Sequence, residues 1–311
     1  MDRFEDLQAF VTVVEAGSFT AAAERIDSNK SVISRRVSAL EERLGVQLLR
    51  RTTRTLNLTD TGRSFYERST RILSDLDEAE SAVAQEHGEL RGQLRVALPL
   101  SFGIRHMGEP IAKFNRQHPQ IRFDLDLSDR RVDIVQEGID VAIRIGRLRD
   151  SSLIARRLFE SRTVVCASPA YLQAYGTPET PQSLSDHPCM VYSNLDDADH
   201  WTYREQSGEE KRVRLNCIME ANSGDMLQKV AIGGLGIVMQ PMFIAHEAIG
   251  RGELTPILAN YHWPVTTAYA IYPPARHLSF RVRAFIDFLV EFFDGIPNWD
   301  VECQREARLL L

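Results

Sequence analysis

Apolar residues recur at helical spacing along the first third of the chain. Five of them between Phe4 and Val14 predict an amphipathic helix, and the alanine-rich residues 20–26 predict a second helix with Ser18 as its N-cap. Residues 61–89 contain glycine only near their ends, and their apolar positions step by four and three residues. This period of 3.5 residues predicts one long helix with a coiled-coil seam, formed by Phe65, Ser69, Ile72, Leu76, Ala79 and Val83.

Between these helices, residues 31–44 predict a helix with two different faces, which Gly45 ends. Its apolar face holds Ile33, Val37, Leu40 and Leu44. Its other face is small, basic and rich in hydroxyl groups, and it holds Ser31, Ser34, Arg35 and Ser38. Short side chains let a helix approach the major groove of DNA, where arginine and hydroxyl groups meet base edges and phosphates. The residues we expect to contact DNA from this helix are Lys30, Ser31, Ser34 and Arg35.

The surroundings of this helix are basic. Residues 30–63 hold eight Lys or Arg and three Asp or Glu, whereas the whole chain has a formal net charge of -6. A basic patch on an acidic protein indicates a polyanionic partner. Two short apolar runs around a polar tip then predict two strands and a wing, with Arg51, Thr52 and Arg54 at the height of the DNA phosphates. The alternative interpretation is an ordinary amphipathic helix followed by a hairpin.

Motif residues favour DNA binding over that alternative. The run AFVTVVEAGSFTAAAER, followed by SVISRRVSALEERLGVQLLRRTTRTLNLTDTG, closely resembles the N-terminal winged helix-turn-helix of LysR-type transcriptional regulators. The matching positions are Phe10, Gly17, Ser18, Ala21, Ala22, Ala23, Ser34, Leu40, Glu41, Leu44, Gly45, Leu48, Arg51, Leu58, Thr59 and Gly62. Leu49 departs from the phenylalanine that is usual in this family, and the turn at residues 27–29 is more polar than usual.

The resemblance implies a DNA-binding head at residues 1–59 and a linker helix at residues 60–89 that pairs two subunits. Dimerisation is also favoured because DNA-binding heads usually act in pairs on symmetric sites. The seam is short and contains Ser69, so it needs support from the rest of the protein. The alternative is a long helix that lies on its own domain.

Beyond residue 90 the pattern changes to short alternating runs. Strands are predicted at residues 94–98, 121–127 and 140–146, with a helix after the first and another that begins at Val132. This alternation favours an α/β fold with a mostly parallel sheet. A strand at residues 267–272 and a final helix after Ser279 are expected to return to the first lobe, and residues 295–311 to form a loosely held tail.

Three strings of this region, VDIVQEGIDVAIRIG, VVCASPAYL and AIGGLGIVMQP, look like the effector domain of the same family. That domain resembles a type-2 periplasmic-binding protein, in which two lobes enclose a cleft. The resemblance implies an α/β chain with an effector-binding domain at residues 90–294. Lobe I is expected at about residues 90–161 and 267–294, and lobe II at about residues 162–266.

Ligands of open α/β lobes bind at the carboxyl ends of strands. The candidate effector-binding residues at those ends are Ser101, Phe102, Ser128, Arg144, Asn222 and Ser223. Hydroxyl groups, amide donors and one arginine suit a small anionic or polar effector, and Phe102 suggests room for an apolar or aromatic body. Each has an alternative role, because the serines can be caps and Arg144 can pair with a local carboxylate. Their match to the family's effector cleft favours them as a set.

Composition limits the other classes of function. The 311 residues are 43% hydrophobic and 26% charged, as in an ordinary soluble protein with more than one domain. We expect a cytoplasmic protein without a membrane partner, since there is no signal peptide and no apolar run of spanning length. The four cysteines are expected to be reduced thiols, with a redox disulfide among the first three as the alternative. The eight histidines show no zinc-binding spacing, so no metal and no cofactor are expected.

The sequence therefore predicts a LysR-type regulator and not an enzyme. The resemblance implies as partners double-stranded DNA with an interrupted palindromic operator, a small-molecule effector, RNA polymerase, and copies of the chain in a homodimer or homotetramer. The alternatives from other classes are a two-lobed small-molecule-binding protein and an enzyme, each with a head that does not bind DNA.

Overall fold

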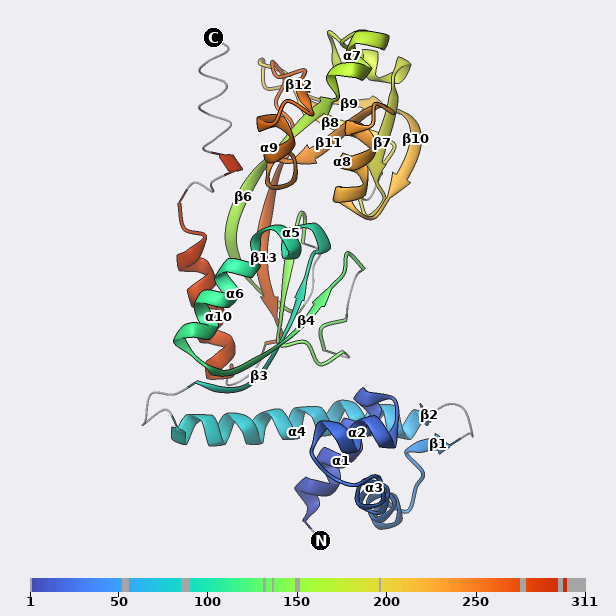
Figure 1. Ribbon diagram of the computed structural model, residues 1–311, viewed down its shortest axis with the longest axis vertical. Coiled ribbons are helices and arrows are strands. Elements are labelled where there is room, and N and C mark those ends of the chain that lie inside the picture. Colours follow the sequence, from blue (N-terminus) through green and yellow to red (C-terminus); the bar gives the residue numbers. More distant parts are fainter. Residues whose placement is uncertain are drawn as a thin grey trace. The chain divides into compact units, whose positions relative to one another are not determined.

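A computed structural model describes residues 2–51, 56–84, 90–130, 133–135, 137–148, 152–195, 197–274, 278–295 and 299–300 (Figure 1). The chain divides into two compact units. The first is Met1–Gly92 with Val135–Gly138, and the second is Gln93–Ile134 with Ile139–Leu311.

The first unit opens with the three predicted helices, which are α1 (Arg3–Ala16), α2 (Phe19–Arg25) and α3 (Lys30–Leu44). The Ser18 hydroxyl accepts a hydrogen bond from the backbone N–H of Ala21 at 3.1 Å and so caps α2. Gly45 ends α3 in the left-handed conformation, with φ 68°, where glycine carries no steric penalty. Both sequence-predicted helix boundaries are confirmed.

The core of the first unit lies between α1 and α3. Ile33, Val37 and Leu40 are buried there with Phe10 of α1, as the apolar face predicts. Leu44, the fourth residue predicted on that face, is 40% exposed because α3 ends at it. The two strands of the wing, β1 (Leu49–Arg51) and β2 (Leu56–Leu58), then pair antiparallel.

The long helix α4 (Asp60–Ala84) begins directly after the wing. Phe65 lies against Phe10 with ring centroids 5.7 Å apart, and Leu73 also packs on the core of the head. The first half of α4 therefore lies on its own domain, as the alternative interpretation expected. Ile72 of the predicted seam is nevertheless 47% exposed, whereas the side chains of Ala79 and Val83 lie outside the described residues.

Within the described residues, the second unit is built on a nine-stranded sheet. Its spatial order is β10-β7-β11-β6-β13-β5-β3-β4, with β12 paired to β6. The strands are β3 (Arg91–Leu98), β4 (Gln120–Leu127), β5 (Val141–Ile145), β6 (Ile154–Ala167), β7 (Pro188–Tyr192), β10 (Asn216–Ala221), β11 (Ile237–Pro241), β12 (Thr255–Ile257) and β13 (Val265–Tyr272). Lobe I denotes residues 90–161 and 267–294, and lobe II denotes residues 162–266.

Strand β6 belongs to both lobes. Its first part pairs antiparallel with β13, and its last part pairs antiparallel with β11 and β12 (Figure 1). The expected start of lobe II at residue 162 therefore falls inside one continuous strand of 14 residues. A sequence pattern cannot show such a crossing, because one strand serves two different cores.

Helices cover this sheet, and a separate hairpin of β8 (His200–Arg204) and β9 (Glu210–Arg214) extends lobe II. The helices are α5 (Leu100–His106), α6 (Gly108–Gln117), α7 (Pro169–Tyr175), α8 (Gly224–Ile232), α9 (Met242–Gly250) and α10 (Phe280–Phe292), with a 3-10 turn at Pro181–Asp186. The helix predicted to begin at Val132 is wrong in its described part, where residues 134 and 135 form a turn. The sequence reasoning also missed α9 and β12.

The described part of the C-terminal segment differs from its prediction, whereas residues 296–298 and 301–311 lie outside the described residues. A loosely held tail was expected, yet Trp299 and Asp300 are only 5% and 7% exposed. The cause is a cluster of aromatic side chains that receives the Trp299 ring, described below. Within the described residues, none of the helices has the length and hydropathy that crossing a membrane requires.

Candidate functional sites

The exposed face of α3 carries the residues predicted to contact DNA. Lys30, Ser31 and Arg35 are exposed, and Ser34 is half-buried. The side chains of Ile33, Val37 and Leu40 anchor the opposite face in the core. This helix therefore presents a short, basic surface away from its own domain, which is the geometry a groove-binding helix needs.

The basic residues of α3 divide into two groups. Arg36 pairs with Glu5, and Arg43 donates to the buried carboxylate of Asp6 at 3.2 Å. Among the described residues, no carboxylate lies within ion-pair distance of Lys30 or Arg35. The first group holds α3 to α1, and the second group keeps its charge available for another molecule.

The position of the wing depends on Glu41. Its carboxylate accepts hydrogen bonds from the backbone N–H groups of Leu48 and Leu49, at 2.8 and 3.1 Å. These bonds fix the start of β1 against α3. The predicted wing residues Thr52 and Arg54 lie outside the described residues, as does the side chain of Arg51.

In the second unit, two of the predicted effector residues lie on α5. The Ser101 hydroxyl is buried and accepts a hydrogen bond from the backbone N–H of Asp225 at 3.3 Å, so it joins lobe I to lobe II. Phe102 has no exposed surface. Five rings surround it, from His106, Phe159, Phe243, Phe293 and Trp299. Phe102 was expected to offer its ring to an effector. In the structure its ring is instead buried inside this aromatic cluster.

Ser128 and Arg144 lie near the ends of β4 and β5. The Ser128 hydroxyl accepts from the backbone N–H of Arg130 at 3.1 Å and so caps a turn. Arg144 is half-buried, and burial lowers its pKa, while the carboxylates of Asp129 and Asp126 act in the opposite direction. No described carboxylate is close enough to Arg144 for an ion pair, so its guanidinium keeps hydrogen-bond donors for a ligand.

Asn222 and Ser223 open α8. The Ser223 hydroxyl accepts from the backbone N–H of Met226 at 3.3 Å, which is a helix cap, and Asn222 is exposed. Of the predicted effector residues in lobe II, one therefore has a capping role and one is free to contact solvent or a ligand. The hydroxyl groups of Ser128 and Ser223 therefore act as caps, and their role as effector-binding residues stays a prediction.

Sequence reasoning missed the residues that link the lobes next to this set. The Asp129 carboxylate accepts from the backbone N–H of Leu100 at 3.0 Å, and its backbone carbonyl accepts from Asn194 of lobe II at 2.7 Å. Tyr192 also hydrogen-bonds to the Asp129 side chain, and burial raises the pKa of Tyr192 to about 12 and raises the pKa of Asp129. The position of Asp129 after Ser128, at a strand end, was the available signal.

A second link between the lobes is centred on Arg105 of α5. Its guanidinium donates to Asp225 at 2.6 Å and to Gln228 at 3.0 Å, both on α8. It also reaches Glu247 of α9 at 3.3 Å. Three partners on two helices of lobe II make this arginine a fixed contact across the junction.

The three described cysteines have protonated thiols at neutral pH. Cys166 and Cys189 are buried, and burial raises the pKa of each thiol to about 12. Cys217 pairs in register with Cys189 on the neighbouring strand, and burial raises its pKa as well. Thiols that stay protonated are poor nucleophiles, so the geometry favours the reduced state. Cys303 lies outside the described residues.

One group of acidic and histidine side chains has the spacing of metal ligands. Asp197, Asp199 and His200 bring their ligand atoms together at the surface of lobe II. The two carboxylates already contact His200, and Asp197 pairs with Arg212. These contacts among the side chains explain why the three residues lie close together, and they require no metal ion.

Comparison with known proteins adds to this geometry. The model of the bacterial regulatory helix-turn-helix protein, lysR family, matches residues 4–63, and that of the LysR substrate binding domain matches residues 87–294. The transcriptional regulator CrgA of Neisseria meningitidis is 38% identical over 291 residues, which cover 92% of this chain and 96% of CrgA. The regulator PtxR of Pseudomonas aeruginosa is 37% identical over 291 residues, which cover 94% of this chain and 93% of PtxR.

Solved structures agree with these matches. The structure of CrgA has a TM-score of 0.60 at 35% identity and covers 95% of this chain and all 100% of CrgA. The full-length structure of AphB, a Vibrio cholerae virulence activator, has a TM-score of 0.62 at 29% identity and covers 94% of this chain and 100% of AphB. The similarity therefore extends over both units.

Proposed function

The chain belongs to the LysR family of transcriptional regulators, with a DNA-binding head and an effector-binding domain, and on this premise we propose how the two parts act. The head grips an interrupted palindromic operator, and a small molecule at the junction of lobes I and II changes promoter output. The exposed face of α3 carries the proposal, because Arg35 and Lys30 have no ion-pair partner among the described residues. Its relatives are regulators and not enzymes.

The DNA-binding residues act at two levels. Arg35, with Ser31 and Ser34 beside it, is placed to meet base edges in the major groove. Lys30 and the wing residues Arg51, Thr52 and Arg54 contact phosphates and set the register of the head on the duplex. Sequence choice therefore depends on α3, and the salt dependence of binding depends mainly on the other group.

Two heads act together on a palindrome. A pair of heads needs a dimer, and Ile72, 47% exposed on α4, supports the use of this helix as the seam. We propose a homodimer, or a homotetramer of two such pairs, in the cytoplasm, where the operator DNA lies. RNA polymerase is the further partner through which promoter output changes.

The effector site uses Arg144, Ser101, Ser128, Asn222 and Ser223. Arg144 is the anchor, because a half-buried guanidinium without a close carboxylate favours an anionic or polar ligand. Asp129 links the lobes beside it, so a ligand that contacts Arg144 alters the contacts between lobes. A coupling of about 1–3 kcal/mol between this junction and the DNA-binding head would switch output.

The DNA-binding part is tested by Arg35→Ala on the intergenic DNA upstream of the chain's own gene. Fluorescence anisotropy should show a loss of about 1–3 kcal/mol and a weaker preference over scrambled DNA. The matched control is Arg283→Ala, which removes an exposed arginine from α10 of the second unit. Unchanged affinity and preference in Arg35→Ala would contradict the placement of α3.

The effector part is tested in a reporter strain that carries the same promoter region. Arg144→Gln should remove the response of the reporter to metabolite extracts, while the purified variant keeps its affinity for DNA. The double variant Ser101→Ala, Ser128→Ala should weaken the response. A normal response in Arg144→Gln would refute the proposed anchor without affecting the assignment of α3.

A further inference from the structure

The helix α10 begins without a side-chain cap. Ser279 stands at its N-cap position, yet its hydroxyl makes no hydrogen bond to the helix. The first bond of the helix runs from the backbone N–H of Arg283 to the carbonyl of Ser279, at 3.0 Å. Among the described residues, no group accepts from the N–H groups of Phe280, Arg281 and Val282. Phe280 is 37% exposed, so this helix end borders solvent, and its free donors and dipole favour an anion.

Two polar side chains at this end of α10 are buried and unpaired. Arg281 is only 5% exposed, and its Nε has no hydrogen-bond partner. Ser279 is 9% exposed, and its hydroxyl has no partner either. No described carboxylate lies within ion-pair distance of the Arg281 guanidinium. Buried polar groups are almost always hydrogen-bonded, and a buried charge is costly without a partner, so this pair of residues indicates a ligand.

The burial of Arg281 follows from its place on the helix. It lies one turn before Phe285, on the face of α10 that packs into lobe I. There the Phe285 ring lies 5.1 Å from that of Phe114 and 5.3 Å from that of Phe123. An apolar residue would suit such a position better than an arginine. Side chains of a helix lean toward its N-terminus, so this second helical residue directs its guanidinium back over the first turn, which Ser279 begins.

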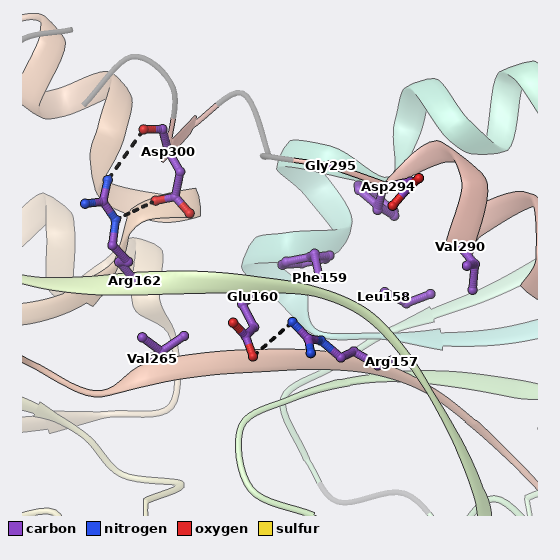
Figure 2. A pocket seen from close by; sticks show the side chains of 11 residues that line it. Arg157, Leu158, Phe159, Glu160, Arg162, Val265, Val290, Asp294, Gly295 and Asp300 are labelled. Atoms are coloured by element: carbon purple, nitrogen blue, oxygen red, sulfur yellow. Dashed lines mark hydrogen bonds and ion pairs between the residues drawn. The ribbon is translucent and has the colours of Figure 1, made fainter. Parts of the chain in front are cut away.

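Arginines at the opposite end of α10 have carboxylate partners. A cavity of about 520 Å³ lies there, and Figure 2 shows Arg157 on its wall paired with Glu160 at 3.1 Å. Arg162 of the same cavity pairs with Asp300 at 3.4 Å. Both arginine side chains are at least half exposed. Arg281 is far more buried and has no such partner among the described residues, so we expect its partner to come from outside the chain.

We propose that the start of α10 binds a phosphate group, either as inorganic phosphate or as part of a small metabolite. The planar guanidinium of Arg281 donates to two phosphate oxygens. The free N–H groups of the first turn and the Ser279 hydroxyl donate to the others, as helix N-termini that bind phosphate do. A carboxylate has fewer oxygens and less charge, so it uses fewer of these donors. None of the proposed effector residues belongs to α10, so this is a second site.

The test follows urea unfolding of the full-length chain by tryptophan fluorescence, since all three tryptophans lie in the second unit. Inorganic phosphate, glycerol phosphate and acetate are compared in the millimolar range, with sodium chloride holding the ionic strength constant. At ten times its Kd, inorganic phosphate should raise the folding equilibrium constant about elevenfold. Acetate should have a smaller effect. An equal effect of glycerol phosphate means that the group binds on a carrier, whereas an effect of inorganic phosphate alone restricts the site to the free ion.

Variants place the phosphate at α10. Arg281→Met should remove the phosphate effect, and without phosphate it should be at least as stable as wild type, because an apolar side chain replaces an unpaired buried charge. Arg283→Met is the matched control. It removes the same charge at an exposed position two residues along, and it should keep the phosphate effect. Ser279→Ala should weaken phosphate binding about tenfold, as expected for the loss of one hydrogen bond to a charged group.

Three outcomes would overturn the proposal. The first is no phosphate effect in wild type, or an equal effect of acetate. The second is the same phosphate effect in wild type and Arg281→Met, which would reflect general exclusion of phosphate from the protein surface. The third is a midpoint that rises with protein concentration and not with phosphate, which would make a second copy of the chain the partner of Arg281. Phosphate bound at Arg144 would act on Arg281→Met as well, so this variant separates the site from the proposed effector site.

Discussion

The indole ring of Trp299 lies against the imidazole ring of His106, with ring centroids 4.4 Å apart. His106 belongs to α5 in lobe I, whereas Trp299 belongs to the C-terminal segment. The same indole also contacts the ring of Phe243 on α9 in lobe II, at 6.4 Å. One aromatic side chain from the end of the chain therefore completes the packing between the lobes.

This packing predicts a large loss of stability in Trp299→Ala. Replacement of a buried tryptophan by alanine leaves a cavity and should cost about 3–5 kcal/mol of the free energy of unfolding of the second unit. Urea unfolding followed by the fluorescence of Trp201 and Trp263 measures it, since all three tryptophans lie in this unit. Ile104→Ala, at a residue of α5 that is 65% exposed, is the control and should change little. A loss below 1 kcal/mol in Trp299→Ala would contradict the packing role.

The tail shows where sequence reasoning failed for the fold. Helices and strands with a clear period, such as α3 and β4, were predicted within one or two residues. Trp299 stands alone in a polar stretch without any period, so nothing local shows that a distant cluster around Phe102 receives it. Burial that depends on a contact between distant segments is not encoded in a local pattern.

The burial of His106 predicts that the second unit loses stability on mild acidification. Burial lowers the pKa of His106, although its hydrogen bond to the carbonyl of Phe243, 2.7 Å long, partly opposes the shift. The unfolded chain then binds more protons between the folded pKa and about 6.5. Stability is complete above about pH 6.5 and falls as the pH drops towards the folded pKa.

Urea unfolding at a series of pH values between 5 and 7.5 checks this slope, and His106→Phe should flatten it. His118, whose pKa is also lowered by burial, contributes the remainder. The buried carboxyls Asp129 and Asp300 have pKa values raised above 3.8. Their contribution to stability therefore falls as the pH rises from about 3.8 through their folded pKa values, which is the opposite slope to that of His106. An identical slope in wild type and His106→Phe would exclude His106 as the cause.

Two arginines of α3 predict opposite phenotypes. Arg43→Ala removes the hydrogen bond to Asp6, whose carboxylate is 1% exposed, and leaves Arg36 at 3.9 Å as its remaining cation. We expect a loss of about 3 kcal/mol in the free energy of unfolding of the first unit. Arg35→Ala, at an exposed position, should change stability by less than about 0.5 kcal/mol but weaken DNA binding. Calorimetry measures the stability of both variants, and fluorescence anisotropy measures their affinity for DNA. If both variants lost stability and affinity to the same extent, the two arginines would not have separate roles.

The functional sites were predictable to different degrees. The α3 face follows from a local period, so Lys30, Ser31 and Arg35 could be placed on its outer side from the sequence alone. The lobe junction depends on which loops meet. Asp129 and Asn194 are 65 residues apart and follow strands that are not neighbours in the sheet, so only the meeting of lobe I with lobe II brings them together. Phe102 was misplaced because an aromatic residue after a strand end suits both a ligand pocket and a core.

A close approach at Gly62 predicts that the start of α4 tolerates no side chain. A Cβ built on Gly62 would overlap the backbone carbonyl oxygen of Leu48, which cannot move freely because it also accepts from the Thr59 hydroxyl at 3.2 Å. Gly62→Ala should therefore cost about 3 kcal/mol of the stability of the first unit. Gly45→Ala is the matched control, since a Cβ there meets nothing within 4 Å and only the left-handed φ of 68° opposes it, at about 1 kcal/mol. Far-UV circular dichroism during thermal unfolding compares the two, because the first unit contains no tryptophan. If Gly62→Ala were as stable as Gly45→Ala, the backbone of Leu48 would lie farther from the start of α4 than this contact requires.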